Sequence, residues 1–104
     1  MKNNIFQNIP DSIPDEVIEI ITKSESIRIE RIVSDGHSSP PDFWYDQDQN
    51  EFVILLSGSA DLMFKNEKVL HLTPGDYINI PAHEKHRVVS TDKKEKSVWL
   101  TVHY

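Results

Sequence analysis

The sequence predicts a mainly β protein, a small antiparallel β-barrel or jelly roll with one short helix near its amino terminus. Apolar and β-branched residues occur in many short runs, and glycine, proline and polar residues separate these runs. The chain has 104 residues, which suits a single hydrophobic core. We therefore expect residues 1–104 to form one domain.

The helix is expected over about residues 12–22. Ser12 or Asp11 can cap its first turn, and Pro14 is of the type favoured at the start of a helix. The apolar residues that would share one helical face are Val17, Ile20 and Ile21. This helix would cover the outside of the barrel or contact a partner subunit.

The barrel is expected over about residues 27–104. Its strands are predicted at residues 27–33, 52–56, 60–64, 69–72, 77–80, 86–90 and 98–104. Residues 52–56 are apolar at every position, which predicts a strand buried on both faces. Glu30 and Arg31 interrupt the alternation of the first strand, as a β-bulge would. Residues 73–76 place Pro and Gly at the centre of a type II turn.

The composition is that of an ordinary soluble domain, with 38% hydrophobic and 27% charged residues. The sequence contains no apolar run long enough to span a membrane, and its first ten residues lack the apolar core of a secretory signal. We therefore expect a cytoplasmic protein without a membrane partner.

Charge and cysteine content exclude further classes of function. The chain has no cysteine, so disulfides, thiolate nucleophiles and cysteine-bound zinc are excluded. The net charge is -6, whereas a nucleic-acid-binding surface is basic. A nucleic-acid partner is therefore not expected, and any metal would have nitrogen and oxygen ligands.

Two groups of residues carry the candidate chemistry. In the first group Glu51 is followed by Gly58, and in the second Gly75 is followed by Pro81 and His86. A carboxylate and an imidazole from separate strands form the usual start of a metal or acid/base site, because each alone binds a divalent ion poorly.

This spacing resembles that of the cupin superfamily. The first cupin motif ends in a glutamate and, after six residues, a glycine, as from Glu51 to Gly58. The second joins a glycine to a proline and a histidine, as from Gly75 to His86. The resemblance covers about residues 27–104 and implies a small single-domain cupin, a double-stranded β-helix. Such a barrel would bind a small molecule in its central pocket, with a possible divalent metal (Fe, Mn, Zn or Ni).

The resemblance also implies a set of site residues, although this chain lacks the two histidines of the first motif. Their places fall on Tyr45 and Gln47 if the gap before Glu51 has three residues, and on Trp44 and Asp46 if it has four. The first register supplies weak ligands, whereas the second adds a carboxylate that suits iron, manganese or zinc. The candidate metal ligands are Glu51, His86, Asp46 and Gln47.

Further side chains are candidates for the pocket. Trp44 and Tyr45 are expected near the mouth of the barrel, and His83 occupies a place where the family has glycine. His103 shares a face of the last strand with Trp99. Because the opposite face of that strand is aliphatic, we expect His103 to point outward.

Three functions are compatible with these observations. The barrel could be a metal-dependent enzyme acting on a small molecule, a metal-free binding or sensing module, or a dimerisation barrel without catalysis. Nucleophilic catalysis is not expected, because the chain has neither a cysteine nor a recognisable serine nucleophile motif. The residue types do not choose a reaction, so no catalytic residue is assigned. A homodimer is expected, because residues 52–56 would expose more apolar surface than one helix can cover.

Overall fold

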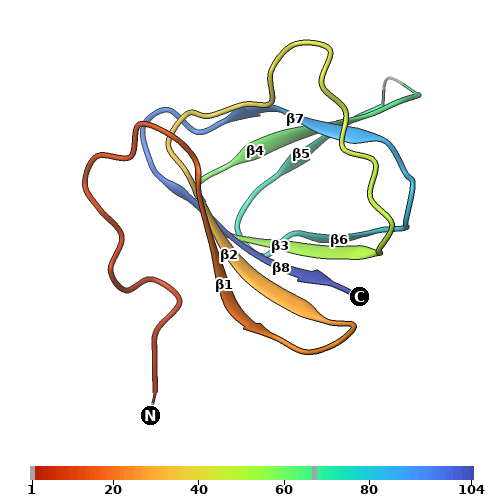
Figure 1. Ribbon diagram of the computed structural model, residues 1–104. Helices are drawn as coiled ribbons and strands as arrows, with labels where there is room; N and C mark the ends of the chain where they lie inside the picture. Colours follow the sequence, from red (N-terminus) through yellow and green to blue (C-terminus); the bar gives the residue numbers. More distant parts are fainter. Residues whose placement is uncertain (1, 67) are drawn as a thin grey trace.

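Residues 2–66 and 68–104 are described in a computed structural model, in which two antiparallel sheets face each other (Figure 1). The strands are β1 (Val17–Lys23), β2 (Arg28–Ser34), β3 (Glu51–Ser57), β4 (Ala60–Phe64), β5 (Val69–Leu72), β6 (Tyr77–Ile80), β7 (His86–Thr91) and β8 (Ser97–His103). The larger sheet has the order β1-β2-β8-β3-β6 and the smaller one the order β5-β4-β7. Residues 2–66 and 68–104 include no helix with the length and hydropathy to cross a membrane.

The main core fills the space between the two sheets. It contains the buried residues Val53, Leu55, Ala60, Leu62, Phe64, Leu72, Ile80 and Trp99. Val53 and Leu55 of β3 point inward, whereas Phe52 and Ile54 on the other face are only half-buried. The sequence predicted that β3 is buried on both faces, but only its inner face is fully buried.

The predicted helix over residues 12–22 is wrong, because Val17–Lys23 form strand β1. β1 pairs with β2 in antiparallel register, with Val17 opposite Val33. Most residues of β1 are β-branched, and such side chains lose rotamer freedom in a helix but fit a pleated sheet. The free edge of β2 supplies the backbone hydrogen bonds that decide in favour of the strand.

The bulge predicted at Glu30 and Arg31 lies instead in the partner strand. The register of β1 shifts between Ile20 and Thr22, whereas β2 pairs with β8 without interruption. Glu30 and Arg31 break the hydrophobic alternation for a different reason. Both are buried, on opposite faces of β2, so this strand buries a charged group on each side.

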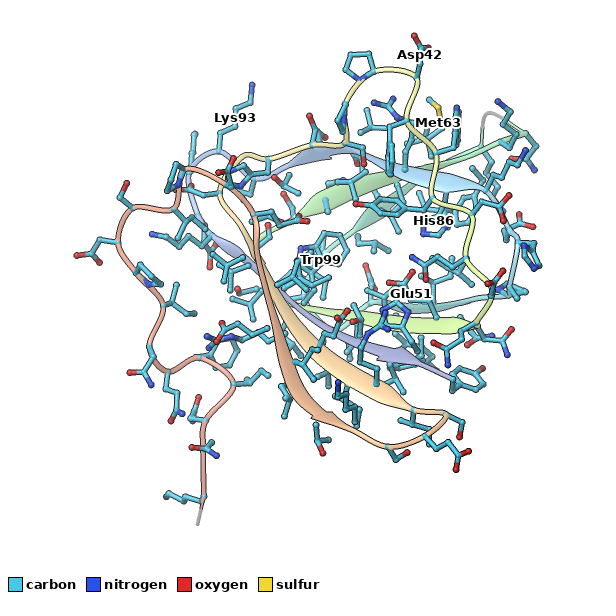
Figure 2. The ribbon with its side chains drawn as sticks, viewed as in Figure 1. Asp42, Glu51, Met63, His86, Lys93 and Trp99 are labelled. Carbon is cyan, nitrogen blue, oxygen red and sulfur yellow. The ribbon has the colours of Figure 1, made fainter. Side chains whose placement is uncertain are left out.

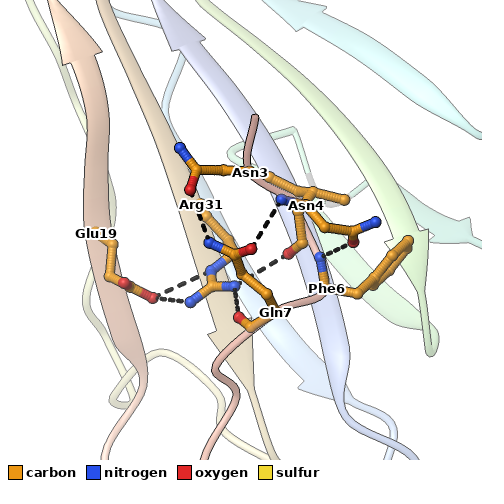
Figure 3. Close-up of polar contacts among 7 residues, drawn as sticks. Asn3, Asn4, Phe6, Gln7, Glu19 and Arg31 are labelled. Carbon is orange, nitrogen blue, oxygen red and sulfur yellow. Dashed lines mark hydrogen bonds and ion pairs between the residues drawn. The ribbon is translucent and has the colours of Figure 1, made fainter. Parts of the chain in front are cut away.

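Arg31 binds the segment before β1, residues 2–16, which we call the amino-terminal arm, to the outer face of the larger sheet (Figure 3). Its guanidinium donates hydrogen bonds to the Glu19 carboxylate and to the backbone carbonyls of Ile5 and Gln7. The apolar side chains of this arm cover a second, smaller core cluster of Ile13, Val33 and Val98. The arm thus takes the covering role that the sequence assigned to a helix.

The long connection over residues 35–50 runs beside β7 of the smaller sheet (Figure 1). Tyr45 forms an antiparallel bridge with His86, with N···O distances of 2.7 Å and 3.2 Å. The carbonyl of Gln47 accepts a hydrogen bond of 2.8 Å from the amide of His83. These backbone contacts place both segments of the predicted site against each other at one end of the barrel.

Candidate functional site in the barrel cavity

A cavity of about 240 Å³ lies between the two sheets. Its polar lining includes Glu30, Tyr45, Gln47, Glu51, His86 and His103. The apolar side chains around it come from both sheets, among them Ile32, Val53, Leu62, Ile80 and Val88. A cavity whose surface is mainly apolar, with polar groups at fixed places, is the usual form of a small-molecule site.

Glu51 and His86 meet inside this cavity. Each is the first residue of its strand, and both side chains are nearly buried, with exposed fractions of 13% and 8%. The distance from His86 Nε2 to Glu51 Oε1 is 3.4 Å. Figure 2 shows both side chains pointing into the space between the sheets.

A second contact of His86 determines where its protons lie. His86 Nδ1 lies 2.8 Å from the carbonyl oxygen of Glu84, and a carbonyl can only accept, so Nδ1 carries a proton. The facing Nε2 and Glu51 oxygen would repel each other if both were unprotonated. The Glu51/His86 pair therefore holds one further proton between its two partners.

The pKa of His86 agrees with this assignment. Burial by itself lowers the pKa, but the hydrogen bonds to Glu51 and Glu84 and the negative charges of these residues raise it above its ordinary value. His86 therefore remains protonated to a higher pH than an exposed histidine does.

Glu30 and His103 form a second carboxylate and imidazole pair on the wall of the same cavity. The distance from His103 Nε2 to Glu30 Oε1 is 3.1 Å, and both residues are buried. The second oxygen of Glu30 accepts a hydrogen bond of 3.0 Å from Arg28 Nε. The sequence analysis expected His103 to point outward, and this expectation is wrong.

Glu51 and the Glu30/His103 pair are neighbours in the larger sheet, whereas His86 lies on β7 of the smaller sheet. Glu51 of β3 is the direct cross-strand partner of His103 on β8, and His103 is in turn the partner of Arg28 on β2. Directly opposed residues in antiparallel strands have Cα atoms roughly 4.5–5.5 Å apart. Across β2, β8 and β3 this row consists of Arg28, His103 and Glu51, two basic side chains followed by a carboxylate.

Trp99 adds a hydrogen-bond donor to the cavity. Its indole lines the cavity and the residue is only 4% exposed. Its Nε1 is buried and has no hydrogen-bond acceptor among residues 2–66 and 68–104. Figure 2 shows the Trp99 side chain in the space between the two sheets.

Tyr45 and Gln47 complete the polar lining. The ring of Tyr45 stacks on that of His86, with centroids 5.4 Å apart. Burial raises the pKa of Tyr45, and the charges of Glu16 and Glu51 raise it further. The phenol therefore stays protonated and can donate a hydrogen bond, while the Gln47 amide can donate or accept.

The other predicted site residues lie outside the cavity lining. Asp46 contacts His83 on the surface, with 2.8 Å between Oδ1 and Nδ1, and both side chains are exposed. The left-handed backbone of His83, with φ of 65°, turns its ring toward this carboxylate. Trp44 packs its ring under Lys65, whose Nζ lies 4.6 Å from the ring centroid. Of the two registers, that of Tyr45 and Gln47 therefore faces the cavity.

The described residues fit a divalent metal poorly. The bond from Nδ1 to Glu84 directs Nε2 of His86 into the cavity, an orientation that suits a metal ligand as well as a proton donor. Among residues 2–66 and 68–104, however, no three His, Asp or Glu side chains gather as a metal site. A carboxylate and an imidazole completed only by an amide and a phenol form a weak site for first-row ions.

Sequence reasoning missed the residues contributed by the central strands. Trp99, Thr101 and His103 occupy every second position of β8 and face the cavity. The signal was present, since an aromatic and polar face alternates with Val98, Leu100 and Val102. The aliphatic face turns outward because the amino-terminal arm covers part of it, with Val98 in the second core cluster.

The two sheets and the cavity between them define a single-domain antiparallel β-barrel with polar groups in its interior. The cupin domain family matches residues 30–103, and the chain belongs to this family. The chain is 41% identical to a Ralstonia eutropha JMP134 protein described as a "putative mannose-6-phosphate isomerase". That similarity covers 99% of this chain and 96% of the other, with a TM-score of 0.95.

More distant structures support the fold alone. A cupin superfamily protein from Desulfitobacterium hafniense DCB-2 is 20% identical, with a TM-score of 0.75 over 91% of this chain and 82% of the other. An RmlC-like cupin with a double-stranded β-helix fold from Methanocaldococcus jannaschii is 16% identical, with a TM-score of 0.71 over 91% and 84%. A comparison with curated proteins gives no match.

Proposed function

We propose that the cavity binds a small, uncharged organic molecule with hydroxyl or carbonyl oxygens, and that it does so without a metal ion. The observation that carries this proposal is the buried Trp99 Nε1–H, which has no acceptor among the described residues. An unsatisfied buried donor costs about 1–3 kcal/mol. An oxygen atom of a bound ligand would remove this penalty.

The rest of the lining supports a ligand with several oxygens. The Glu51/His86 pair spans the two sheets and the Glu30/His103 pair lies on the larger one, so donors and acceptors come from both sides of the cavity, and the Tyr45 phenol adds a donor. The volume of about 240 Å³ lies below the roughly 300–1,000 Å³ of sites for drug-sized ligands. A molecule of a few carbon atoms, up to the size of a simple sugar, is the class that we infer.

The charges around the cavity favour an uncharged ligand. Glu16, Glu30 and Glu51 contribute carboxylates, whereas Arg28 is the arginine of the lining and already donates to Glu30. A phosphate group in this cavity would face like charges at low dielectric. The description of the Ralstonia relative names a sugar phosphate, and we infer that this chain prefers the unphosphorylated compound.

Isothermal titration calorimetry tests this proposal, with D-mannose, D-glyceraldehyde and mannose 6-phosphate as probes. We expect at least one uncharged probe to bind. The Trp99→Phe variant, which lacks the donor, should lose about tenfold in affinity, equivalent to one hydrogen bond of about 1.4 kcal/mol. Trp44→Phe is the matched control, because Trp44 packs against Lys65 outside the cavity.

The calorimetry also gives results that would contradict the proposal. Binding of mannose 6-phosphate that is tenfold tighter than that of D-mannose would refute the preference for an uncharged ligand. If neither uncharged probe binds at millimolar concentration, or if Trp99→Phe binds as tightly as the parent protein, the proposed site is wrong.

A further inference from the structure

We propose that the ligand of the cavity is amphiphilic, with a small head that carries several oxygen atoms and a short unbranched alkyl chain. This inference rests on the proposed function and deepens it, because it states which part of the ligand contacts which part of the cavity. The observation behind it is that polar and apolar lining residues are separated along the strands of the larger sheet.

The polar end of the cavity is a row of three side chains across the larger sheet. Arg28 on β2 is opposite His103 on β8, and His103 is opposite Glu51 on β3. Directly opposed residues of antiparallel strands project from the same face, and all three side chains line the cavity. From the smaller sheet, His86 lies 3.4 Å from Glu51 at this end. A head with several oxygen atoms therefore finds hydrogen-bond partners on both sheets.

The apolar end is a second row, four positions further along β2. Ile18 on β1 is opposite Ile32 on β2, and Ile32 is opposite Trp99 on β8. These three side chains also line the cavity, and Figure 2 shows Trp99 set apart from Glu51 and His86 in the same space. Because a strand rises about 3.4 Å per residue, the two rows are roughly 13 Å apart. An extended molecule with one polar and one apolar end fits this separation.

The smaller sheet is polarised in the same direction. Strand β7 begins at the polar end, where His86 meets Glu51. It ends beside the loop that follows β2, where Thr91 Oγ1 donates a hydrogen bond of 2.6 Å to the carbonyl of His37. Val88 lies between these two points and lines the cavity. Both sheets thus change from a polar to an apolar lining along the cavity.

Exposure along the apolar row increases toward the edge of the sheet. Trp99 is 4% exposed and Ile32 is half-buried, whereas Ile18 is 55% exposed. Ile18 is the most exposed of the apolar side chains that line the cavity. An alkyl chain that runs from Trp99 over Ile32 to Ile18 would cover it, and the removal of apolar surface from water favours binding.

Two further groups set the position and the length of the chain. The Nε1–H of Trp99 is the hydrogen-bond donor of the apolar row, so it suits the oxygen that joins the head to the chain. Glu16 lines the cavity two positions before Ile18, and its carboxylate accepts a hydrogen bond of 2.7 Å from Ser34 Oγ. Because a carboxylate is a poor neighbour for an alkyl group, Glu16 ends the apolar row and limits the chain to a few carbon atoms.

Isothermal titration calorimetry with glycerol, glycerol monoethyl ether and glycerol monopentyl ether tests the inference. The probes share one head and differ in the alkyl chain. We expect the monopentyl ether to bind about tenfold more tightly than the monoethyl ether. A fully buried methylene group is worth about fourfold in affinity, and the additional methylene groups of the longer chain would be buried in part.

Three variants separate the apolar row from general hydrophobic binding. Ile18→Asn should remove most of the preference for the longer chain and leave the affinity for the monoethyl ether unchanged. Ile21→Asn is the matched control, because Ile21 is 51% exposed on the same strand but lines a separate hollow beside the amino-terminal arm. It should keep the ratio of the two affinities found in the parent protein. Trp99→Phe should weaken both ethers by the same factor, because it removes the donor to the shared oxygen.

The outcomes of the calorimetry distinguish this inference from the proposed function. If the monopentyl ether binds no more tightly than the monoethyl ether while an uncharged probe still binds, this inference fails and the proposed function stands. If no uncharged probe binds, both are contradicted. A preference for the longer chain that survives in Ile18→Asn, or that disappears in Ile21→Asn, overturns the assignment of the apolar row.

Two further measurements complete the test. Ile18→Thr, which keeps a β-branched side chain, gives the same comparison if the melting curve shows that Ile18→Asn does not fold. Light scattering on the calorimetric samples reports whether a second copy of the chain covers Ile18. A preference for the longer chain that is present in the monomer and absent in a dimer would overturn the proposal.

Discussion

At the residue scale, four of the five histidines lie against a carboxylate. His71 and His83 pair with Asp61 and Asp46 on the surface, where solvent screens such contacts and they contribute little to stability. His86 and His103 are buried, so their carboxylate partners offset a desolvation penalty that would otherwise be severe. The same amino-acid pairing therefore has chemical consequences only inside the barrel.

The raised pKa of His86 predicts a pH-dependent contribution to stability. A group whose pKa is higher in the folded state stabilises fully below its ordinary value of about 6.5, and this contribution disappears as the pH rises through the folded pKa. We expect the difference in unfolding free energy between the parent and His86→Gln to fall between pH 6 and pH 9. Urea denaturation across this range measures it, and a difference that grows with pH would contradict the assignment.

Two glycines with positive φ should differ in how much stability is lost when a side chain is added. Gly58 has φ of 75°, and a Cβ there would lie 2.7 Å from the Cα of Ser97. Gly75 has φ of 96° in the turn that Asp76 N closes on Thr73 O, with no atom within 4 Å of an added Cβ. We expect Gly75→Ala to cost about 1 kcal/mol and Gly58→Ala about 3 kcal/mol or more. Denaturant unfolding of both variants measures this, and equal losses would disprove the packing argument.

At the element scale, strands β2 to β8 could be predicted from the local sequence pattern, whereas β1 could not. β4 alternates strictly and folds as expected, and the turn at Gly75 follows from Pro and Gly at its centre. In the first element, Val17, Ile20 and Ile21 fit a helical face as well as a strand. Pairing with the edge of β2 decides between them, and the pattern of residues 17–23 alone does not contain that information.

The candidate site was partly predictable for the same reason. Glu51 and His86 belong to spaced motifs, and the structure brings them together in the cavity. Glu30 and His103 belong to no motif, and their orientation depends on which face of β2 and β8 the amino-terminal arm covers. The arm lies far from β8 in sequence, so the inner face could not be chosen from β8 alone.

The contacts of Arg31 predict how strongly the amino-terminal arm is held against the larger sheet. It is 7% exposed and donates to the Ile5 and Gln7 carbonyls as well as to Glu19. Arg31→Met should lower stability by about 2 kcal/mol and speed amide hydrogen exchange in residues 2–9. Glu19→Gln keeps the bonds to the carbonyls and should have a smaller effect. Unchanged exchange in Arg31→Met would show that apolar contacts alone hold the arm.

At the scale of the whole molecule, apolar side chains remain exposed on one edge. Ile18, Ile20 and Ile21 of β1 are 55%, 52% and 51% exposed, and β1 is the outermost strand of the larger sheet. The sequence analysis placed the exposed apolar surface on β3, whose outer face is in fact half-buried. An exposed apolar edge strand is a site at which proteins associate.

We predict a homodimer that uses the β1 edge. Light scattering after size exclusion should give about twice the chain mass of 12.0 kDa at micromolar concentration. Ile20→Lys, which places a charge on this edge, should shift the protein toward monomer, whereas Phe52→Lys on β3 should not. A parent protein that runs as a monomer at tens of micromolar would refute the prediction.

The indole resonances of the two tryptophans test the central claim, that Trp99 Nε1–H binds an oxygen of a ligand in the cavity. ¹H–¹⁵N spectra resolve each indole N–H, and Trp99→Phe and Trp44→Phe assign them. On titration with D-mannose or D-glyceraldehyde, the Trp99 resonance should move downfield as its proton gains an acceptor, while that of Trp44 stays in place. A saturating ligand that leaves the Trp99 resonance unmoved, or that shifts only Trp44, would contradict the account.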